Sequence, residues 1–140
     1  MKKLKFILVD DNEAFRCALR MLLINQYNAE IIAEASNADD VLLIPDLHKA
    51  DIILMDLMIP GKNGIDITKE LLWKYSRHFK IVAITMHAEK VYLTTLIEAG
   101  FRGCIFKNDL YNQLTEALSV VYDGNLYFPK DILLDYNKQY

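Results

Sequence analysis

The stretch IILMDLMIPG, residues 52–61, places one carboxylate, Asp56, at the end of an apolar run and shortly before a Pro-Gly turn. A short apolar run that ends at a turn is typical of a buried strand. Removing an ionised carboxylate from water is costly unless a nearby charge or metal ion stabilises it. Asp56 is therefore either a strand-end residue that caps the turn or a residue that does chemistry, and the rest of the sequence has to distinguish the two.

The length and composition of the chain fit one globular domain. A chain of 140 residues is long enough for one core and short for two domains of usual size. It is 53% hydrophobic and has no apolar run near the roughly 20 residues that a membrane helix needs. The apolar patch at residues 6–9 is shorter than the core of a signal peptide, and acidic residues follow it at once. We therefore expect a cytoplasmic protein that does not contact a membrane.

The charges, cysteines and histidines argue against several classes of function. The formal net charge is −3, and no basic stripe is present that would neutralise nucleic-acid phosphates. Cys17 and Cys104 lie far apart without CxxC spacing, so they indicate neither a zinc site nor a disulfide. The histidines His48, His78 and His87 are isolated, and no HExxH motif occurs. We expect none of these residues to bind a metal.

Short apolar segments alternate with amphipathic ones along the chain. The apolar runs predict strands at residues 5–9, 29–35, 52–56, 80–85 and 103–106. Apolar stripes at helical spacing predict helices at residues 13–24, 64–75, 89–99 and 112–122, and one more that follows Asn37 and runs to about Leu47. Asn37 suits an N-cap, Pro45 is expected to kink or end its helix early, and Gly100 is expected to end the fourth helix.

These segments form five βα units in strict order. Such alternation predicts an α/β protein with a doubly wound, five-stranded parallel sheet and helices on both faces, in a single domain. The nearly continuous apolar strands agree, because strands buried on both faces need not alternate in polarity. In an open sheet of this kind the functional site lies beyond the carboxyl ends of the strands.

The residues at those carboxyl ends have complementary chemistry. Asp10 and Asp11 follow the first expected strand, Asp56 and Thr85 end the third and fourth, and Lys107 follows the fifth. Three clustered carboxylates repel one another unless a cation lies among them, and Mg²⁺ prefers oxygen ligands. A carboxylate can form an acyl phosphate, and an ammonium and a hydroxyl can bind phosphoryl oxygens. The set predicts that Asp56 is phosphorylated, assisted by Thr85 and Lys107.

The chain resembles the receiver domain of bacterial two-component response regulators. The segments that carry the resemblance are ILVDDNEAFR, IILMDLMIPGKNGID, IVAITMH and AGFRGCIFKND, which together span about residues 5–124. The resemblance implies a flavodoxin-like (βα)₅ fold and phosphotransfer from a sensor histidine kinase onto Asp56, with switch roles for Thr85 and Lys107. It implies Mg²⁺ ligation by three carboxylates and one backbone carbonyl: Asp10, Asp11, Asp56 and Met58. It also implies a protein that catalyses only its own phosphorylation and dephosphorylation.

The wording TMHAEKVYLTTLIEAG and the tail GNLYFPKDI are most similar to the NarL/FixJ (LuxR-type) subfamily of DNA-binding regulators. Members of that subfamily continue into a helix-turn-helix output domain, which would contact nucleic acid and regulate transcription. We assign residues 1–124 to the receiver and residues 125–140 to a linker or tail without an output domain. The chain is then either part of a longer regulator or a stand-alone receiver.

Cys104 departs from the pattern of the family. Members usually carry Tyr or Phe three residues before the lysine, and here that position holds Cys104. Phe106 shares its strand face but does not occupy the same position. We interpret Cys104 as a small apolar strand residue rather than a redox group, and we expect weaker coupling between phosphorylation and the far surface.

Two other functions compete with the receiver hypothesis. A haloacid-dehalogenase-type phosphohydrolase also uses an Asp nucleophile after a strand, but it carries a second Asp two residues later, where this chain has Met58. A pseudo-receiver would act only as a protein-interaction domain, yet all three carboxylates, Thr85 and Lys107 are present.

A partner-facing surface is expected on the last two helices and the fifth strand, at residues 89–99, 103–106 and 112–122. Residues 91–93 are consecutive and apolar, so they cannot all face inward from one helix, and at least one is expected to be exposed. Exposed apolar residues often mark contacts, so a homodimer formed through this surface is a further hypothesis.

Overall fold

The computed structural model describes residues 3–75 and 79–134, so His78 lies outside the described residues. Within these ranges the chain forms one sheet of five parallel strands in the order β2-β1-β3-β4-β5. The strands are β1 (Leu4–Val9), β2 (Ala29–Ala35), β3 (Ile52–Asp56), β4 (Lys80–Thr85) and β5 (Gly103–Phe106). The predicted doubly wound, flavodoxin-like fold is confirmed.

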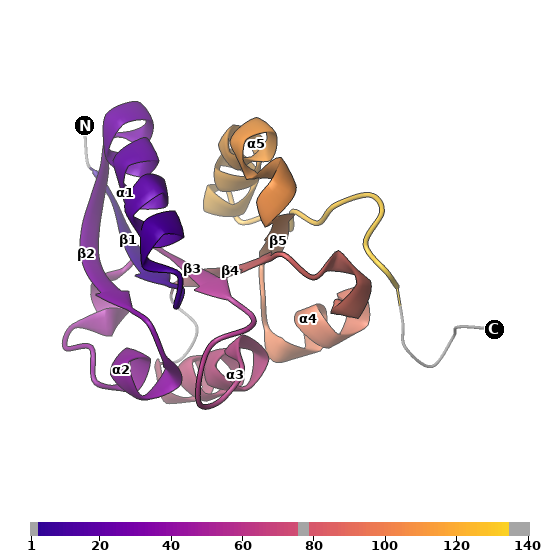
Figure 1. The fold of residues 1–140 in the computed structure, drawn as a ribbon, viewed down its shortest axis with the longest axis horizontal. Coiled ribbons are helices and arrows are strands. Elements are labelled where there is room, and N and C mark those ends of the chain that lie inside the picture. The colour runs from indigo at the N-terminus through magenta and orange to yellow at the C-terminus, as the bar shows by residue number, and fades with distance from the viewer. Residues whose placement is uncertain (1–2, 76–78, 135–140) are drawn as a thin grey trace.

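Helices cover both faces of the sheet. They are α1 (Glu13–Tyr27), α2 (Ala38–Leu42), α3 (Gly64–Tyr75), α4 (Leu93–Ala99) and α5 (Leu110–Tyr122). Figure 1 shows α1 and α5 above the sheet and α2, α3 and α4 below it. No helix among the described residues is both long enough and apolar enough to span a membrane.

Each face of the sheet has its own hydrophobic core. Ile7 and Val9 of β1 pack into the core on the side of α2, α3 and α4, whereas Phe6 and Leu8 pack into the core beneath α1 and α5. Burying a large aliphatic side chain stabilises a fold by roughly 1.5–3 kcal/mol, so both sides of each strand contribute. This explains why the strands are apolar almost without interruption.

The strand order reverses at β1, which lies between β2 and β3. The crevice between β1 and β3 is therefore the topological switch point, where ligands bind in open α/β sheets. The parallel register aligns the carboxyl ends of the strands through the pairs Val9 with Met55, Asp56 with Ile84, and Thr85 with Phe106. The residues that end these strands or directly follow them therefore lie together at the carboxyl-terminal end of the sheet.

The second helix is shorter than expected. Asn37 is its N-cap, as predicted, and its side chain accepts a hydrogen bond of 2.8 Å from the amide of Asp40. The helix ends at Leu42 rather than near Leu47, which agrees with the expectation that Pro45 ends it early. Pro45 explains the early end, because the residue before a proline is driven out of the helical region.

The fourth helix begins later than expected. Ala88–Lys90 form a 3₁₀ turn, Val91 and Tyr92 are extended, and α4 starts only at Leu93. The prediction that at least one of residues 91–93 is exposed is wrong, because Val91 is buried and the other two are half-buried. Gly100 ends α4 in the left-handed conformation, with φ of 101°, as predicted.

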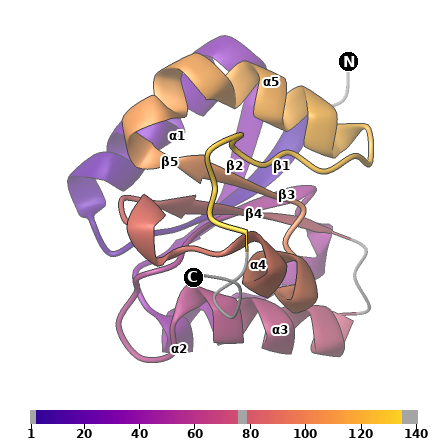
Figure 2. The ribbon, with the colours of Figure 1, turned by 90° about the vertical axis from the view of Figure 1, so that its right-hand side faces the viewer.

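Residues 125–134, which we call the C-terminal segment, lie against the domain. Figure 2 shows this segment running from the end of α5 across β5 to α4. Tyr127 forms a parallel bridge with Gly103 of β5, and Leu133 forms one with Tyr92. The segment therefore covers part of the surface that was expected to face partners.

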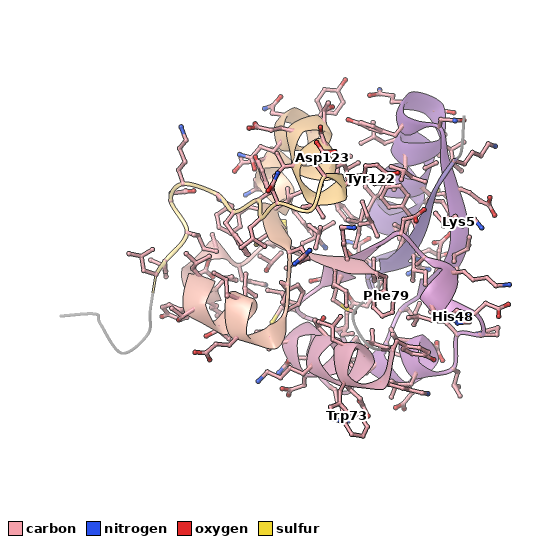
Figure 3. The ribbon with its side chains drawn as sticks, turned by 180° about the vertical axis from the view of Figure 1, so that it is seen from behind. Lys5, His48, Trp73, Phe79, Tyr122 and Asp123 are labelled. Carbon is pink, nitrogen blue, oxygen red and sulfur yellow. The ribbon has the colours of Figure 1, made fainter. Side chains whose placement is uncertain are left out.

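Trp73, the single tryptophan of the chain, lies on the outer side of α3. Its side chain is 89% exposed and points away from the fold (Figure 3). Because its surroundings are already aqueous, its fluorescence is a poor probe of unfolding, and circular dichroism is the better measurement for this protein.

Candidate functional site

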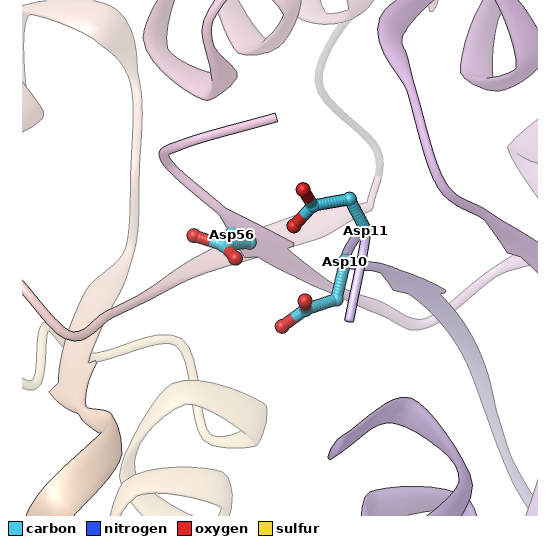
Figure 4. Close-up of side chains that lie close together, drawn as sticks. All are labelled: Asp10, Asp11 and Asp56. Carbon is cyan, nitrogen blue, oxygen red and sulfur yellow. The ribbon is translucent and has the colours of Figure 1, made fainter. Parts of the chain in front are cut away.

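Three carboxylates meet at the switch point of the sheet. Asp10 and Asp11 follow β1 directly, and Asp56 is the last residue of β3. Each contributes an oxygen that lies within 4.8 Å of the oxygens of the other two. Asp10 and Asp56 are buried, Asp11 is exposed, and Figure 4 shows the three side chains together at the strand ends. The convergence that the sequence predicted is present.

Lys107 lies between the two buried carboxylates. It opens the 3₁₀ turn after β5, and its Nζ is 2.7 Å from Asp10 Oδ2 and 3.1 Å from Asp56 Oδ2. Burial alone lowers the pKa of Lys107, but the hydrogen bond to Asp10 and the charge of Asp56 outweigh it, so the pKa is raised. The ammonium therefore stays charged and offsets part of the carboxylate repulsion.

Asp56 is held in place by its own loop and by Lys107. Its Oδ1 accepts a hydrogen bond of 3.0 Å from the amide of Met58, and its Oδ2 accepts one from Lys107. Burial raises the pKa of Asp56, the charge of Asp10 raises it further, and the Met58 amide and Lys107 oppose this only in part. Additional positive charge at this site would favour the ionised, nucleophilic form.

The start of α1 fixes Asp10. The amide of Asn12 donates to Asp10 Oδ1 at 2.8 Å, while the Asn12 side chain caps α1 by accepting from the amide of Phe15. Arg16 donates to the backbone carbonyl of Asp10 and forms an ion pair of 2.8 Å with Glu34 of β2. The sequence interpretation did not include Asn12 or Arg16, although an Asn just before a helical stripe is a recognisable capping signal.

Phe15 is a further residue that the sequence interpretation missed. The Nζ of Lys107 lies 4.2 Å from the centroid of the Phe15 ring, which is the geometry of a cation–π contact. The ring also lines an apolar hollow of about 330 Å³ between α1 and the start of α5. No sequence signal pairs these residues, because they lie on elements at opposite ends of the chain.

Gly64 allows the loop after β3 to close on Asp56. Its amide donates to the carbonyl of Leu57 at 3.0 Å. A Cβ at this position would lie 2.5 Å from the carbonyl oxygen of Asp56, so any larger residue must displace the backbone that carries the carboxylate. The side chain of Met58, in the same loop, is 51% exposed.

Thr85 lies at the end of the neighbouring strand and is completely buried. It follows Ile84, which is paired with Asp56 across the sheet. Its hydroxyl accepts a hydrogen bond of 3.0 Å from the amide of His87, in the loop that leads to α4. Thr85 therefore connects the site to that loop, and a hydroxyl of this kind can donate a hydrogen bond as well as accept one.

Cys104 is completely buried in the core that contains Phe106. Burial raises the pKa of its thiol to about 12, so the group is neutral at physiological pH. It packs as a small apolar residue, as expected.

The donor set fits Mg²⁺. The clustered donors are carboxylate oxygens, which are the ligands that Mg²⁺ prefers, and exposed Asp11 leaves one side open for the waters that this ion retains. The three carboxylates carry more negative charge than the ammonium of Lys107 offsets. A divalent cation would neutralise this surplus negative charge. Together, the carboxylates, Lys107 and Thr85 can bind a cation and a phosphoryl group at the carboxyl-terminal end of the sheet.

An open parallel sheet that carries this set at its switch point defines a class of signalling domain. The chain matches the family described as "Response regulator receiver domain" over residues 6–119. It belongs to this family and is a receiver domain of the two-component response regulators. The resemblance inferred from the sequence is confirmed.

Similar proteins agree with this assignment. The chain is 25% identical over 138 residues to the transcriptional regulatory protein DegU of Brevibacillus brevis, covering 99% of this chain and 58% of DegU. It is 31% identical over 125 residues to the oxygen regulatory protein NreC of Staphylococcus haemolyticus, covering 89% of this chain and 57% of NreC. The chain thus spans about three fifths of the length of these curated relatives.

Solved structures show the same fold. A LuxR-family response regulator from Aurantimonas sp. superposes with a TM-score of 0.82 at 26% identity, over 94% of this chain and 93% of that one. The receiver domain of RcsB from Salmonella enterica, solved with the phosphomimetic BeF₃⁻, has a TM-score of 0.82 at 19% identity, over 96% of this chain and 100% of that one. The latter likeness concerns the fold alone.

Proposed function

We propose that this chain accepts a phosphoryl group from a sensor histidine kinase on Asp56, in a reaction that requires Mg²⁺. One observation carries the proposal: a buried carboxylate at the switch point lies 3.1 Å from a lysine ammonium and beside two further carboxylates. With a divalent cation bound beside Lys107, such a site can hold the negative charge of a phosphoryl group next to the attacking carboxylate.

The chain's own residues have distinct roles in this proposal. A carboxylate oxygen of Asp56 attacks the phosphorus of a phosphohistidine; a P–O bond forms, the P–N bond breaks, and the imidazole leaves with its electron pair. Lys107 remains protonated and binds a phosphoryl oxygen, while the Thr85 hydroxyl donates its hydrogen to another. Water later attacks the phosphorus, the bond between phosphorus and the Asp56 oxygen breaks, and inorganic phosphate leaves, which restores the carboxylate.

Asp10, Asp11, Asp56 and the backbone carbonyl of Met58 would hold the metal ion. Mg²⁺ held there would supply positive charge to offset the carboxylates and the phosphoryl oxygens. Asp10 is oriented for this role by the amide of Asn12 and the side chain of Arg16.

Phosphorylation would change the expected partner-facing surface on α4, β5 and α5, and this surface would control an output function beyond this domain. DegU is named a transcriptional regulatory protein and NreC an oxygen regulatory protein, and the chain matches less than two thirds of each. We infer that phosphorylation regulates transcription through a DNA-binding output domain, or through a partner protein when no such domain is attached.

The direct test is incubation with acetyl phosphate and Mg²⁺, followed by intact mass spectrometry. The natural chain is expected to gain one phosphoryl group that decays slowly, and Asp56→Asn is expected to gain none. Asp66→Asn, a change of an exposed aspartate on α3, is the matched control and should behave like the natural chain. Phosphate on another residue would contradict the assignment of Asp56. Rapid release of inorganic phosphate would indicate a phosphohydrolase, and no gain at all would indicate a pseudo-receiver.

A further inference from the structure

The C-terminal segment extends the sheet beyond β5. The amide of Cys104 donates to the carbonyl of Tyr127 at 2.9 Å, and the amide of Tyr127 donates to the carbonyl of Arg102 at 3.0 Å. These two bonds are the pairing of a parallel bridge, so the segment protects part of an edge strand that would otherwise present unpaired backbone groups. The segment is thus bound to the strand that precedes Lys107.

The same segment supplies the missing cap of α4. The first amides of a helix lack partners within the helix, and Tyr92, the N-cap residue, makes no side-chain capping bond. The amide of Leu93 instead donates to the carbonyl of Leu133 at 2.7 Å, and that of Thr94 donates to the carbonyl of Leu134 at 3.1 Å. The start of α4 is therefore fixed by backbone atoms forty positions later in the chain.

Buried side chains hold the segment in place. Pro129 is buried, and Ile132 is 6% exposed and belongs to the core that contains Val91 and Cys104. Phe128 packs against the same core. The segment is therefore held by a few buried side chains near its end, and a change in their support can release it locally without unfolding the domain.

A short path joins this contact to Thr85. The Thr85 hydroxyl is bonded to the amide of His87, whose carbonyl accepts from the amide of Lys90 at 2.9 Å to form the 3₁₀ turn. Val91 and Tyr92 follow this turn and lead into the amides capped by the segment. A displacement of Thr85 toward a group on Asp56 must therefore change the loop that positions the start of α4.

We propose that residues 125–134 are a strap that responds to the phosphorylation state of Asp56. In the unphosphorylated chain the strap caps α4 and covers the α4–β5 surface; when Thr85 is drawn to the phosphoryl group, the loop 86–92 moves with it and the strap is released. The proposal rests on the proposed function, because it needs a phosphoryl group on Asp56. Phosphorylation can then change the α4–β5 surface without a large side chain at Cys104. Until the strap is released, it covers that surface and keeps a partner from binding there.

Hydrogen exchange of the full chain measures the strap directly. In the natural chain, acetyl phosphate with Mg²⁺ is expected to speed exchange of the Leu93 and Thr94 amides by about tenfold or more, together with the amide of Tyr127. Ile132→Glu places a charge in the buried anchor and should produce the faster exchange without phosphorylation. Lys130→Glu introduces the same side chain at an exposed position of the segment and should leave exchange as in the natural chain.

A milder variant, Ile132→Ala, keeps the test valid if Ile132→Glu disturbs the domain, because it removes contacts without burying a charge. It is expected to give an intermediate increase in exchange. Intact mass is recorded on the same samples, so that the proposed phosphorylation and the proposed release of the strap are tested separately. No mass gain in the natural chain overturns the proposed function and the strap with it. A normal gain with unchanged exchange at Leu93 and Thr94 overturns the strap alone, as does equal exchange in Ile132→Glu and Lys130→Glu.

Discussion

The protein environment has opposite effects on the charged forms of Asp56 and Lys107. Burial raises the pKa of Asp56 and so disfavours its charge, whereas Asp10 and Asp56 together keep Lys107 charged. Without a bound cation, the carboxylates at the site therefore repel one another, and the effect of each residue can be measured by substitution.

Asp56→Asn is expected to stabilise the metal-free protein at neutral pH. The folded-state pKa of Asp56 lies above its ordinary value of 3.8, so the folded chain binds a proton more tightly than the unfolded chain does. The free energy of unfolding therefore falls as the pH rises from the unfolded-state pKa of 3.8 through the higher folded-state pKa. At pH values above the folded-state pKa, the free energy of unfolding stays at this lower level. Removing the charge should raise the melting temperature by a few degrees at pH 7, and by less near pH 4.

Thermal melts followed by circular dichroism with a metal chelator provide the measurement for this variant. Asp66→Asn serves as the control, since its carboxylate is exposed and lies outside the cluster. A lower melting temperature for Asp56→Asn at pH 7 would show that Asp56 gains more from Lys107 than it loses through burial.

Phe15→Leu is expected to loosen Lys107. The cation–π contact contributes roughly 0.5–2 kcal/mol, so its loss should slow phosphorylation by acetyl phosphate several-fold. Phe15→Tyr keeps the ring and should retain the natural rate, whereas Leu22→Ala alters the same apolar hollow without touching Lys107. Equal rates for Phe15→Leu and Phe15→Tyr would remove any role for the aromatic face.

At the scale of the element, the loop between β3 and α3 leaves little room for substitution. Met58 and Gly64 both contact Asp56 or its immediate neighbour through their backbones. The loop thus converts the end of a strand into a fixed carboxylate, and its geometry depends on a residue without a side chain.

Gly64→Ala is expected to destabilise the fold and to slow phosphorylation together. The added Cβ would lie 2.5 Å from the Asp56 carbonyl oxygen, and overpacking of this kind costs about 1–3 kcal/mol. Gly124→Ala is the control: it has φ of 91° but no atom within 4 Å of the added Cβ, so it tests backbone strain without a clash. The melting temperature and the rate of mass gain are measured for both. A normal phosphorylation rate in Gly64→Ala would mean that the loop shifts without moving Asp56.

At the scale of the whole molecule, a bound cation should raise the stability of the entire domain. A metal that binds the folded chain and not the unfolded one adds about 2.7 kcal/mol at a hundredfold excess over its Kd. The natural chain is therefore expected to melt at higher temperature as Mg²⁺ is added. Asp11→Ala removes one carboxylate from the cluster and should weaken this dependence at least tenfold in concentration, whereas Asp39→Ala, an exposed change on α2, should not.

Melting curves across a Mg²⁺ titration, repeated with chelator, distinguish binding from general salt effects. A dependence in Asp11→Ala that matches the natural chain would place the metal elsewhere. Calorimetric titration of the same variants gives an independent affinity.

The sequence by itself determined the sheet and most of the site. Strands such as β3 were predicted with correct bounds because burial on both faces leaves a continuous apolar run that is local in the sequence. The carboxylates and Lys107 were also predictable, because parallel topology brings every strand's carboxyl end to one edge once the βα order is known. No three-dimensional coordinates are needed for that step.

The tertiary structure alone decided how these parts are held. Three contacts could not be read from the sequence, because no regular spacing pairs the residues that form them. They are the contact of Phe15 with Lys107, the close approach of Gly64 to Asp56 and the capping of α4 by Leu133. The same long-range backbone bonds explain why α4 starts at Leu93, although helical spacing extends further back. Hydrophobic periodicity reports which side of an element is buried. Backbone hydrogen bonds between distant segments use amides and carbonyls that nearly every residue carries, so the sequence has no signal for which segments will pair.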